Sequence, residues 1–214
     1  MFHCVNRLKI NGYKPHVVLD IGAHKGFWTQ ECKKIYPDSD YFLFEPIDYP
    51  ELKNHKNVFN VVLDKKEGEV DWYEMKNTGD SMYKEQTIHF SDCKPIKRTS
   101  TTLENVFGKL SHTFHSILIK IDCQGAEIPI LQGAGKVLDK TDFIILEMPF
   151  FGQYNEKVPD FKTHIEYMDS IGFVPYDIAD LHYTLSFLIQ IDILFIKKSH
   201  PFNKQVADRL MNDY

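Results

Sequence analysis

An acidic side chain and two glycines stand where an apolar strand passes into a helix near the N-terminus. Residues 17–26 deliver Asp20, Gly22 and Gly26 in that order. Glycine lets the backbone turn tightly and approach a ligand, and the start of a helix offers unpaired N–H groups. The spacing is G-x-x-x-G rather than G-x-G-x-x-G, and Asp20 would repel a pyrophosphate while attracting ammonium and sulfonium groups. The pattern therefore favours S-adenosylmethionine over a dinucleotide, with a plain strand-to-helix turn as the alternative.

A second acidic residue, Glu45, follows the next predicted strand in the segment Phe44-Glu45-Pro46. An acidic residue at this place can accept hydrogen bonds from the two ribose hydroxyls of an adenosine cofactor. Neighbouring parallel strands present their carboxyl ends at one edge of a sheet, where ligands bind. Asp20 and Glu45 together predict an adenosine-containing cofactor there. An NAD-dependent oxidoreductase is the enzyme alternative, and the absent third glycine and Asp20 argue against it.

A third acidic residue, Asp122, closes the fourth predicted strand, and Gly125 opens the helix that follows. Asp122 could also act only as a helix N-cap. Residues 120–127 read K-I-D-C-Q-G-A-E, and residues 131–134 read L-Q-G-A. In these two segments, and in their order along residues 17–197, the sequence resembles the FkbM family of methyltransferases. His24 and Glu104 depart from the commoner asparagine and aspartate of that pattern.

The resemblance implies an α/β chain with a Rossmann-like class I methyltransferase fold. The expected sheet has seven strands, mostly parallel with an antiparallel last strand, and helices cover both faces. The implied cofactor is S-adenosyl-L-methionine, and the residues expected to bind it are Asp20, Gly22, Ala23, His24, Gly26, Phe27, Glu45, Pro46, Asp64 and Asp122.

The implied reaction is in-line transfer of a methyl group to an acceptor hydroxyl, which needs close positioning and a base for the hydroxyl proton. The catalytic candidates are Asp122, Glu147 at the end of the fifth strand, and His182 before the last strand. No tight pair of carboxylates follows the fourth strand, so no metal site is expected.

The expected acceptor is a sugar hydroxyl of a glycan or glycoconjugate. Its binding face is predicted from residues 77–92, residues 150–154 and a turn at residues 180–183, which offer aromatic surfaces beside polar groups. A polyketide or another small hydroxylated metabolite is the alternative acceptor. A non-catalytic S-adenosylmethionine-binding module is the alternative from another class of protein.

Short β-branched runs alternate with helical segments, which is typical of a parallel sheet covered by helices. Strands are expected at residues 16–21, 41–44, 57–63, 116–121, 142–147, 174–178 and 191–197, with a further candidate at 69–74. Helices are expected at residues 25–36, 126–131 and 161–171. The segment 64–101 is the least periodic, and its loop is a candidate lid over the substrate.

The length of 214 residues suits one methyltransferase domain over residues 1–214, with a core at about 14–198 and short helical extensions at both ends. The net charge of -5 gives no basic face for nucleic acid. The four cysteines form no C-x-x-C pair, which fits a reducing compartment. The N-terminus lacks the apolar run of a signal peptide, and no stretch is long enough for a membrane span. These features predict a cytoplasmic protein.

Overall fold

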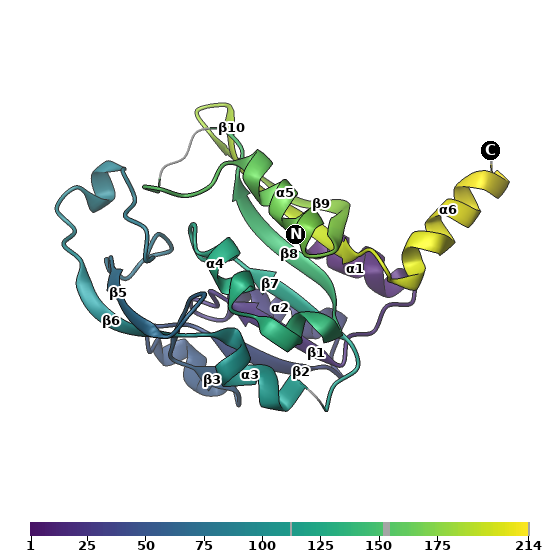
Figure 1. The fold of residues 1–214 in the computed structure, drawn as a ribbon, viewed down its shortest axis with the longest axis horizontal. Helices are drawn as coiled ribbons and strands as arrows, with labels where there is room; N and C mark the ends of the chain where they lie inside the picture. Colours follow the sequence, from purple (N-terminus) through teal and green to yellow (C-terminus); the bar gives the residue numbers. More distant parts are fainter. Residues whose placement is uncertain (112, 152–154, 214) are drawn as a thin grey trace.

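A central sheet dominates the computed structural model, which describes residues 1–111, 113–151 and 155–213 (Figure 1). Seven strands of these residues form the sheet in the order β3-β2-β1-β7-β8-β10-β9. They are β1 (Val17–Ile21), β2 (Asp40–Phe44), β3 (Val58–Phe59), β7 (Ile117–Ile121), β8 (Thr141–Pro149), β9 (Phe173–Thr184) and β10 (Phe187–Lys197). The pairs from β3 to β8 are parallel, whereas β10 runs antiparallel to both β8 and β9. The predicted mostly parallel sheet with an antiparallel last strand is confirmed.

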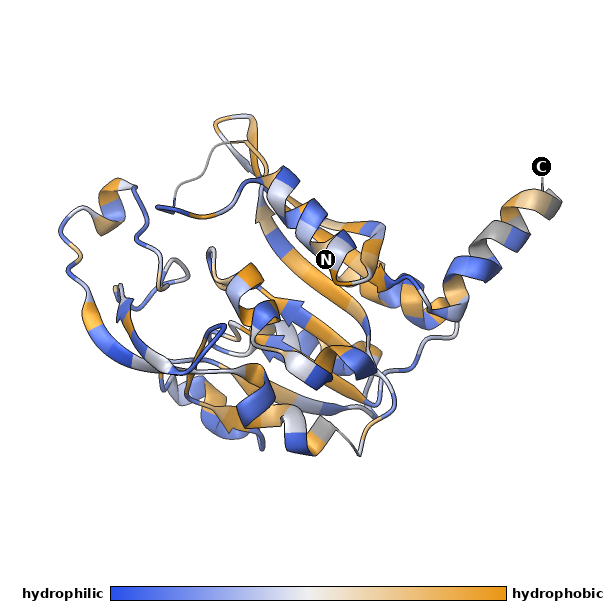
Figure 2. Ribbon diagram, in the orientation of Figure 1, coloured by the Kyte–Doolittle hydropathy of each residue, from blue (hydrophilic) through white to orange (hydrophobic). Residues whose placement is uncertain are grey.

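Helices cover both faces of the sheet, as expected. They are α1 (Phe2–Ile10), α2 (Phe27–Ile35), α3 (Leu103–Ser111), α4 (Glu127–Gln132), α5 (Phe161–Ser170) and α6 (Pro201–Asp213), with 3-10 turns at Pro50–Asn54, Ile88–Phe90 and Gly135–Lys140. Successive side chains of a strand point to opposite faces. Val17 and Leu19 pack with residues of α3, α4 and α5, and Val18 packs with residues of α1 and α2. The strands at the centre of the sheet are accordingly mostly hydrophobic (Figure 2). No helix in the described ranges is long and apolar enough to cross a membrane.

A smaller sheet contains much of the segment 64–101, for which the sequence showed little periodicity. Its described strands are β4 (Val62–Leu63), β6 (Ile96–Thr101) and β5 (Gly68–Trp72), in the order β4-β6-β5. The predicted single strand at 57–63 is wrong in part, because its first residues join β2 and its last join β6. Between them, the Asn60 amide donates to the carbonyls of Glu45 and Ile47, at 3.0 and 3.4 Å, where the chain passes from one sheet to the other.

The hairpin of β9 and β10 is longer than the sequence indicated. The predicted turn at 180–183 is wrong, since these residues belong to β9, and the chain reverses at Leu185 and Ser186. Both turn residues have positive φ, 49° and 68°. Tight hairpin turns with two residues of positive φ usually contain Asn-Gly or a similar pair in the sequence. Leucine and serine give no such signal, so the sequence could not place the turn.

Candidate active site

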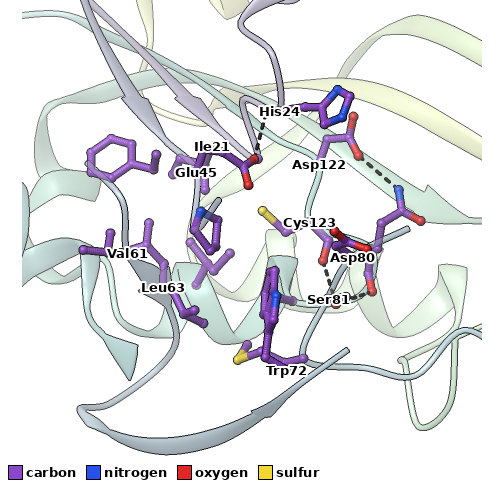
Figure 3. Close-up of a pocket in the computed structure, with 18 of the residues that line it drawn as sticks. Ile21, His24, Glu45, Val61, Leu63, Trp72, Asp80, Ser81, Asp122 and Cys123 are labelled. Carbon is purple, nitrogen blue, oxygen red and sulfur yellow. Dashed lines mark hydrogen bonds between the residues drawn. The ribbon is translucent and has the colours of Figure 1, made fainter. Parts of the chain in front are cut away.

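A cavity of about 690 Å³, counting its open mouth, lies where β1, β2 and β7 end (Figure 3). Its wall combines strand-end residues with the loop beyond β5. The lining residues include Gly22, His24, Glu45, Pro46, Trp72, Asp80, Ser81, Asp122 and Gln124. Five of the predicted cofactor residues, namely Gly22, His24, Glu45, Pro46 and Asp122, therefore lie together.

Two backbone N–H groups hold the side chain of Glu45 at the end of β2. Its Oε2 accepts a hydrogen bond from the His24 N–H at 2.8 Å, and its Oε1 accepts one from the Ile47 N–H at 3.0 Å. Burial raises the pKa of Glu45 to about 7, although both N–H groups favour the charged form. The carboxyl group is thus held rigidly at the wall of the cavity, where it can accept hydrogen bonds from hydroxyls.

The turn after β1 packs closely against the end of β7. Gly22 has φ 74°, and a Cβ placed on it would lie 1.9 Å from the carbonyl oxygen of Asp122. Only glycine tolerates both that conformation and that approach. Ala23, Gly26 and Phe27, also predicted to bind the cofactor, shape the start of α2 and are not among the lining residues of this cavity.

Asp20 lies beneath the cavity instead of in its wall. Its carboxylate is fully buried, accepts a hydrogen bond from Thr29 Oγ1 at 2.6 Å and lies 3.4 Å from Lys120 Nζ. Lys120 Nζ also donates to the Gly22 carbonyl at 3.0 Å and lies 3.4 Å from Asp122 Oδ2. Burial raises the pKa of Asp20 against the opposing effect of Lys120 and Thr29. This placement differs from the expectation that Asp20 faces the cofactor, because strand alternation sends its side chain toward α2.

Lys120 lies at this site, although it is not among the site residues that were expected from the sequence. It is buried in β7, and the neighbouring carboxylates of Asp122 and Asp20 raise its pKa despite the opposing effect of burial. A lysine within an otherwise apolar strand was the available signal, since a buried lysine is rarely left without an acidic partner. Its ammonium group ties Gly22, Asp20 and Asp122 into one unit.

Asp122 and Glu147 are joined by one amide. Gln124 Nε2 donates to Asp122 Oδ1 at 3.2 Å and to Glu147 Oε2 at 2.7 Å. Burial and the nearby charge of Asp122 raise the pKa of Glu147 well above its usual range. At Asp122 burial acts in the same direction, but the charge of Lys120 and the hydrogen bonds from Glu147, Gln124 and Lys120 together outweigh it and the pKa is lowered. Two of the predicted catalytic residues are thus in direct electrostatic contact.

A second, smaller hollow of about 290 Å³ continues on the other side of Gln124. Gln124 belongs to the walls of both cavities. The second one is lined by Gln124, Gly125, Glu127, Glu147, Met148, Pro149, Asn155, Val158 and Gln190. Three amide and two carboxyl side chains take part in this wall beside the apolar side chains of Met148, Pro149 and Val158.

The loop that was expected to cover the substrate lies over the first cavity. Ser81 Oγ donates to the carbonyls of Cys123 and Gln124, at 3.1 and 3.0 Å, which anchors the loop on the turn after β7. Two buried atoms that belong to lining residues, Asp80 Oδ2 and Trp72 Nε1, find no hydrogen-bond partner within the described residues. One is an acceptor and the other a donor, which fits a cavity that binds a polar heteroaromatic ring.

His182, the third catalytic candidate, lies at the far side of Glu147. Its Nε2 is 2.9 Å from Asp192 Oδ2, and this hydrogen bond raises the pKa of the imidazole. Asp64 lines a different surface hollow, beside Lys65 and Tyr83, and not the cofactor cavity. Of the predicted acceptor face, residues 152–154 lie outside the described residues.

Comparisons with known proteins agree with this architecture. The family model described as the methyltransferase FkbM domain matches residues 20–175. The 2-O-methyltransferase NoeI of Sinorhizobium fredii is 25% identical over 165 residues, which cover 67% of each chain. Two solved structures cover 92% of this chain and 77% of their own: 1,6-didemethyltoxoflavin-N1-methyltransferase of Burkholderia thailandensis, at 12% identity and a TM-score of 0.50, and magnesium protoporphyrin IX methyltransferase of Synechocystis PCC 6803, at 8% and 0.51. At these identities the structural likeness shows the shared fold.

Proposed function

Because the chain belongs to the FkbM family of S-adenosylmethionine-dependent methyltransferases, we propose that it methylates a hydroxyl of a sugar residue in a glycan or glycoconjugate. The observation that carries this proposal is the second cavity, whose wall includes the amides of Gln124, Asn155 and Gln190, since Gln124 also lines the first cavity. An apolar acceptor such as a polyketide would favour a continuous hydrophobic lining, as most drug-sized ligand sites have.

The first cavity fits the cofactor by its donors and acceptors. Glu45 is the group for the two ribose hydroxyls, because its carboxylate is held in the wall by backbone N–H groups. The unpaired Asp80 Oδ2 and Trp72 Nε1 are suited to the adenine edge, which has an amino donor and ring-nitrogen acceptors. When bound, the cofactor supplies an activated methyl group on a sulfonium.

In the reaction, a bond forms between the acceptor oxygen and the methyl carbon while the carbon–sulfur bond breaks, which leaves S-adenosylhomocysteine. The hydroxyl proton must leave as the new bond forms. We assign its acceptance to the Asp122 carboxylate, which lines the cofactor cavity and is oriented by Gln124 and Lys120. The same Gln124 amide holds Glu147 at the second cavity, so one residue aligns both halves of the site.

Two exposed aromatic side chains, one following β8 and one at the start of β10, support a sugar acceptor. Phe151 and Phe187 stack with ring centroids 5.6 Å apart, and both are more than half exposed. Exposed rings of this kind stack on the C–H face of a sugar while amides bind its hydroxyl edge. The relative NoeI is named a 2-O-methyltransferase, which supports an oxygen acceptor.

The test is an acceptor screen with isotopically labelled S-adenosylmethionine. The purified chain is incubated with a panel of deoxysugar glycosides and, in parallel, with hydrophobic alcohols, and products are analysed by mass spectrometry. We expect a mass gain of one methyl group on glycosides. Methylation confined to the hydrophobic alcohols would overturn the sugar acceptor and leave the methyltransferase activity intact.

A further inference from the structure

Three side chains from three different strands meet beyond the cofactor cavity. They are Glu147 of β8, His182 of β9 and Asp192 of β10. One carboxylate oxygen or imidazole nitrogen of each lies within 4.8 Å of the others. His182 Nε2 and Asp192 Oδ2 are 2.9 Å apart. These are two carboxylates and one imidazole converging from separate parts of the chain.

The pairing of β8, β9 and β10 brings these three side chains together. Asp192 stands directly opposite Glu147 in the antiparallel pair of β8 and β10, so the two carboxylates share a face of the sheet. His182 stands opposite Gln190, and the pairing of β9 with β10 shifts register on both sides of this region, at Leu188/Gln190 and at Asp192/Ile193. Register shifts of this kind re-aim side chains and are over-represented next to active sites.

Burial makes two adjacent carboxylates costly unless a cation offsets their charge. Asp192 is 1% exposed and Glu147 is 8% exposed. The buried ammonium group of Lys120 already lies against Asp20, Asp122 and the Gly22 carbonyl. The imidazole of His182 is partly exposed, which leaves a path from solvent to the cluster.

We propose that Glu147, His182 and Asp192 bind a divalent cation. One imidazole with two carboxylates is a donor set compatible with first-row divalent ions, among them Mn²⁺. Three protein ligands leave further coordination positions open, and Glu147 also lines the second cavity. A cation there would bind acceptor hydroxyl oxygens and lower their pKa. This last step rests on the proposed function, whereas binding of the cation does not.

The test measures cation binding without cofactor or acceptor. The full chain is treated with a chelator, dialysed and titrated with Mn²⁺, and binding is followed by calorimetry and by the loss of the free-ion electron paramagnetic resonance signal. We expect one saturable site per chain, with affinity at least tenfold weaker in His182→Gln and in Asp192→Asn. The matched controls are His3→Gln on α1 and Asp40→Asn at the start of β2. Both positions are exposed, and both variants should bind Mn²⁺ with the affinity of the unaltered chain.

Circular dichroism and the melting temperature establish that each variant is folded before its affinity is compared. Absence of saturable binding, or equal affinity in the site variants and the controls, would overturn the proposal and leave His182 and Asp192 as a plain ion pair. If Mn²⁺ binds as expected while no glycoside is methylated, the cation site stands and the sugar acceptor fails.

Discussion

The two halves of the proposed active site are built in different ways. The cofactor half, at the ends of β1 and β2, depends on backbone: the Gly22 turn, and the His24 and Ile47 N–H groups that hold Glu45. The acceptor half, at β7, β8, β9 and β10, depends on side chains that hold one another, as Gln124 does with Asp122 and Glu147. The cofactor half draws on the turns that follow β1 and β2, whereas the acceptor half draws on side chains from four strands.

This difference predicts how the halves respond to substitution. A backbone-built half fails when its conformation is blocked, and stability and cofactor affinity fall together. A side-chain-built half can lose one group and keep its fold, so turnover falls while stability and affinity change little.

Gly22→Ala should damage the cofactor half most. Alanine would have to adopt φ 74° and bring its Cβ within 1.9 Å of the Asp122 carbonyl oxygen, so the β1 and β7 ends must separate. We expect a loss of more than about 3 kcal/mol in the free energy of unfolding, measured by denaturant titration. Gly68→Ala is the matched control, since no atom lies within 4 Å of its added Cβ. Equal stability of the two variants would contradict the close packing at Gly22.

Asp122→Asn should chiefly affect turnover. The amide keeps the shape of the side chain and cannot take up the hydroxyl proton, so we expect kcat to fall at least about 100-fold, near 2.7 kcal/mol. Affinity for S-adenosylhomocysteine, measured by calorimetry, should stay within about threefold. If affinity falls as much as kcat, Asp122 belongs to the cofactor half and the contrast between the halves is drawn in the wrong place.

Glu45→Gln should lower the affinity for the cofactor more than it lowers the rate of methyl transfer in the bound complex. The amide nitrogen cannot accept the hydrogen bond of a backbone N–H or of a ribose hydroxyl. We expect affinity for S-adenosylhomocysteine to fall more than tenfold, about 1.4 kcal/mol or more, by calorimetry. Glu69→Gln, at an exposed position of β5, serves as the control. Native affinity in folded Glu45→Gln would remove this residue from the cofactor site.

Glu127→Gln tests whether burial raises the pKa of a second carboxyl group that, like that of Glu45, is held by backbone N–H groups. Glu127 Oε1 accepts from the N–H groups of Cys123 and Gly125, and burial raises the pKa of its carboxyl to about 7. The unfolded chain has an ordinary pKa near 4.3, so the folded state binds more protons between these values and loses stability as the pH rises through that window.

The variant lacks this titration. Between pH 5 and pH 8 the free energy of unfolding of the unaltered chain should fall more than that of Glu127→Gln, by on the order of 1–2 kcal/mol. Thermal unfolding at a series of pH values gives the comparison. Parallel stability curves would contradict the raised pKa of the Glu127 carboxyl group.

Much of the fold could be predicted because it depends on local patterns. Apolar runs such as that of β1 indicate buried strands, and glycine after an acidic strand end indicates the ligand-facing turn. The β2 end with Glu45 was found in the same way, and it lies in the cavity wall. The predicted strand at 57–63 failed because Asn60 binds carbonyls beyond β2, a contact between chain segments that no periodicity reveals.

By itself, then, the sequence determined the sheet, its covering helices, the family and the glycine-rich edge where Gly22, Glu45 and Asp122 gather. Only the tertiary structure decided that Asp20 turns away toward Thr29, that Lys120 ties the strand ends together, and that Glu147, His182 and Asp192 meet. The physical reason is register. A shift of one residue in a strand pair moves every side chain to the other face, so convergence across β8, β9 and β10 depends on pairings and bulges that the individual strands do not encode.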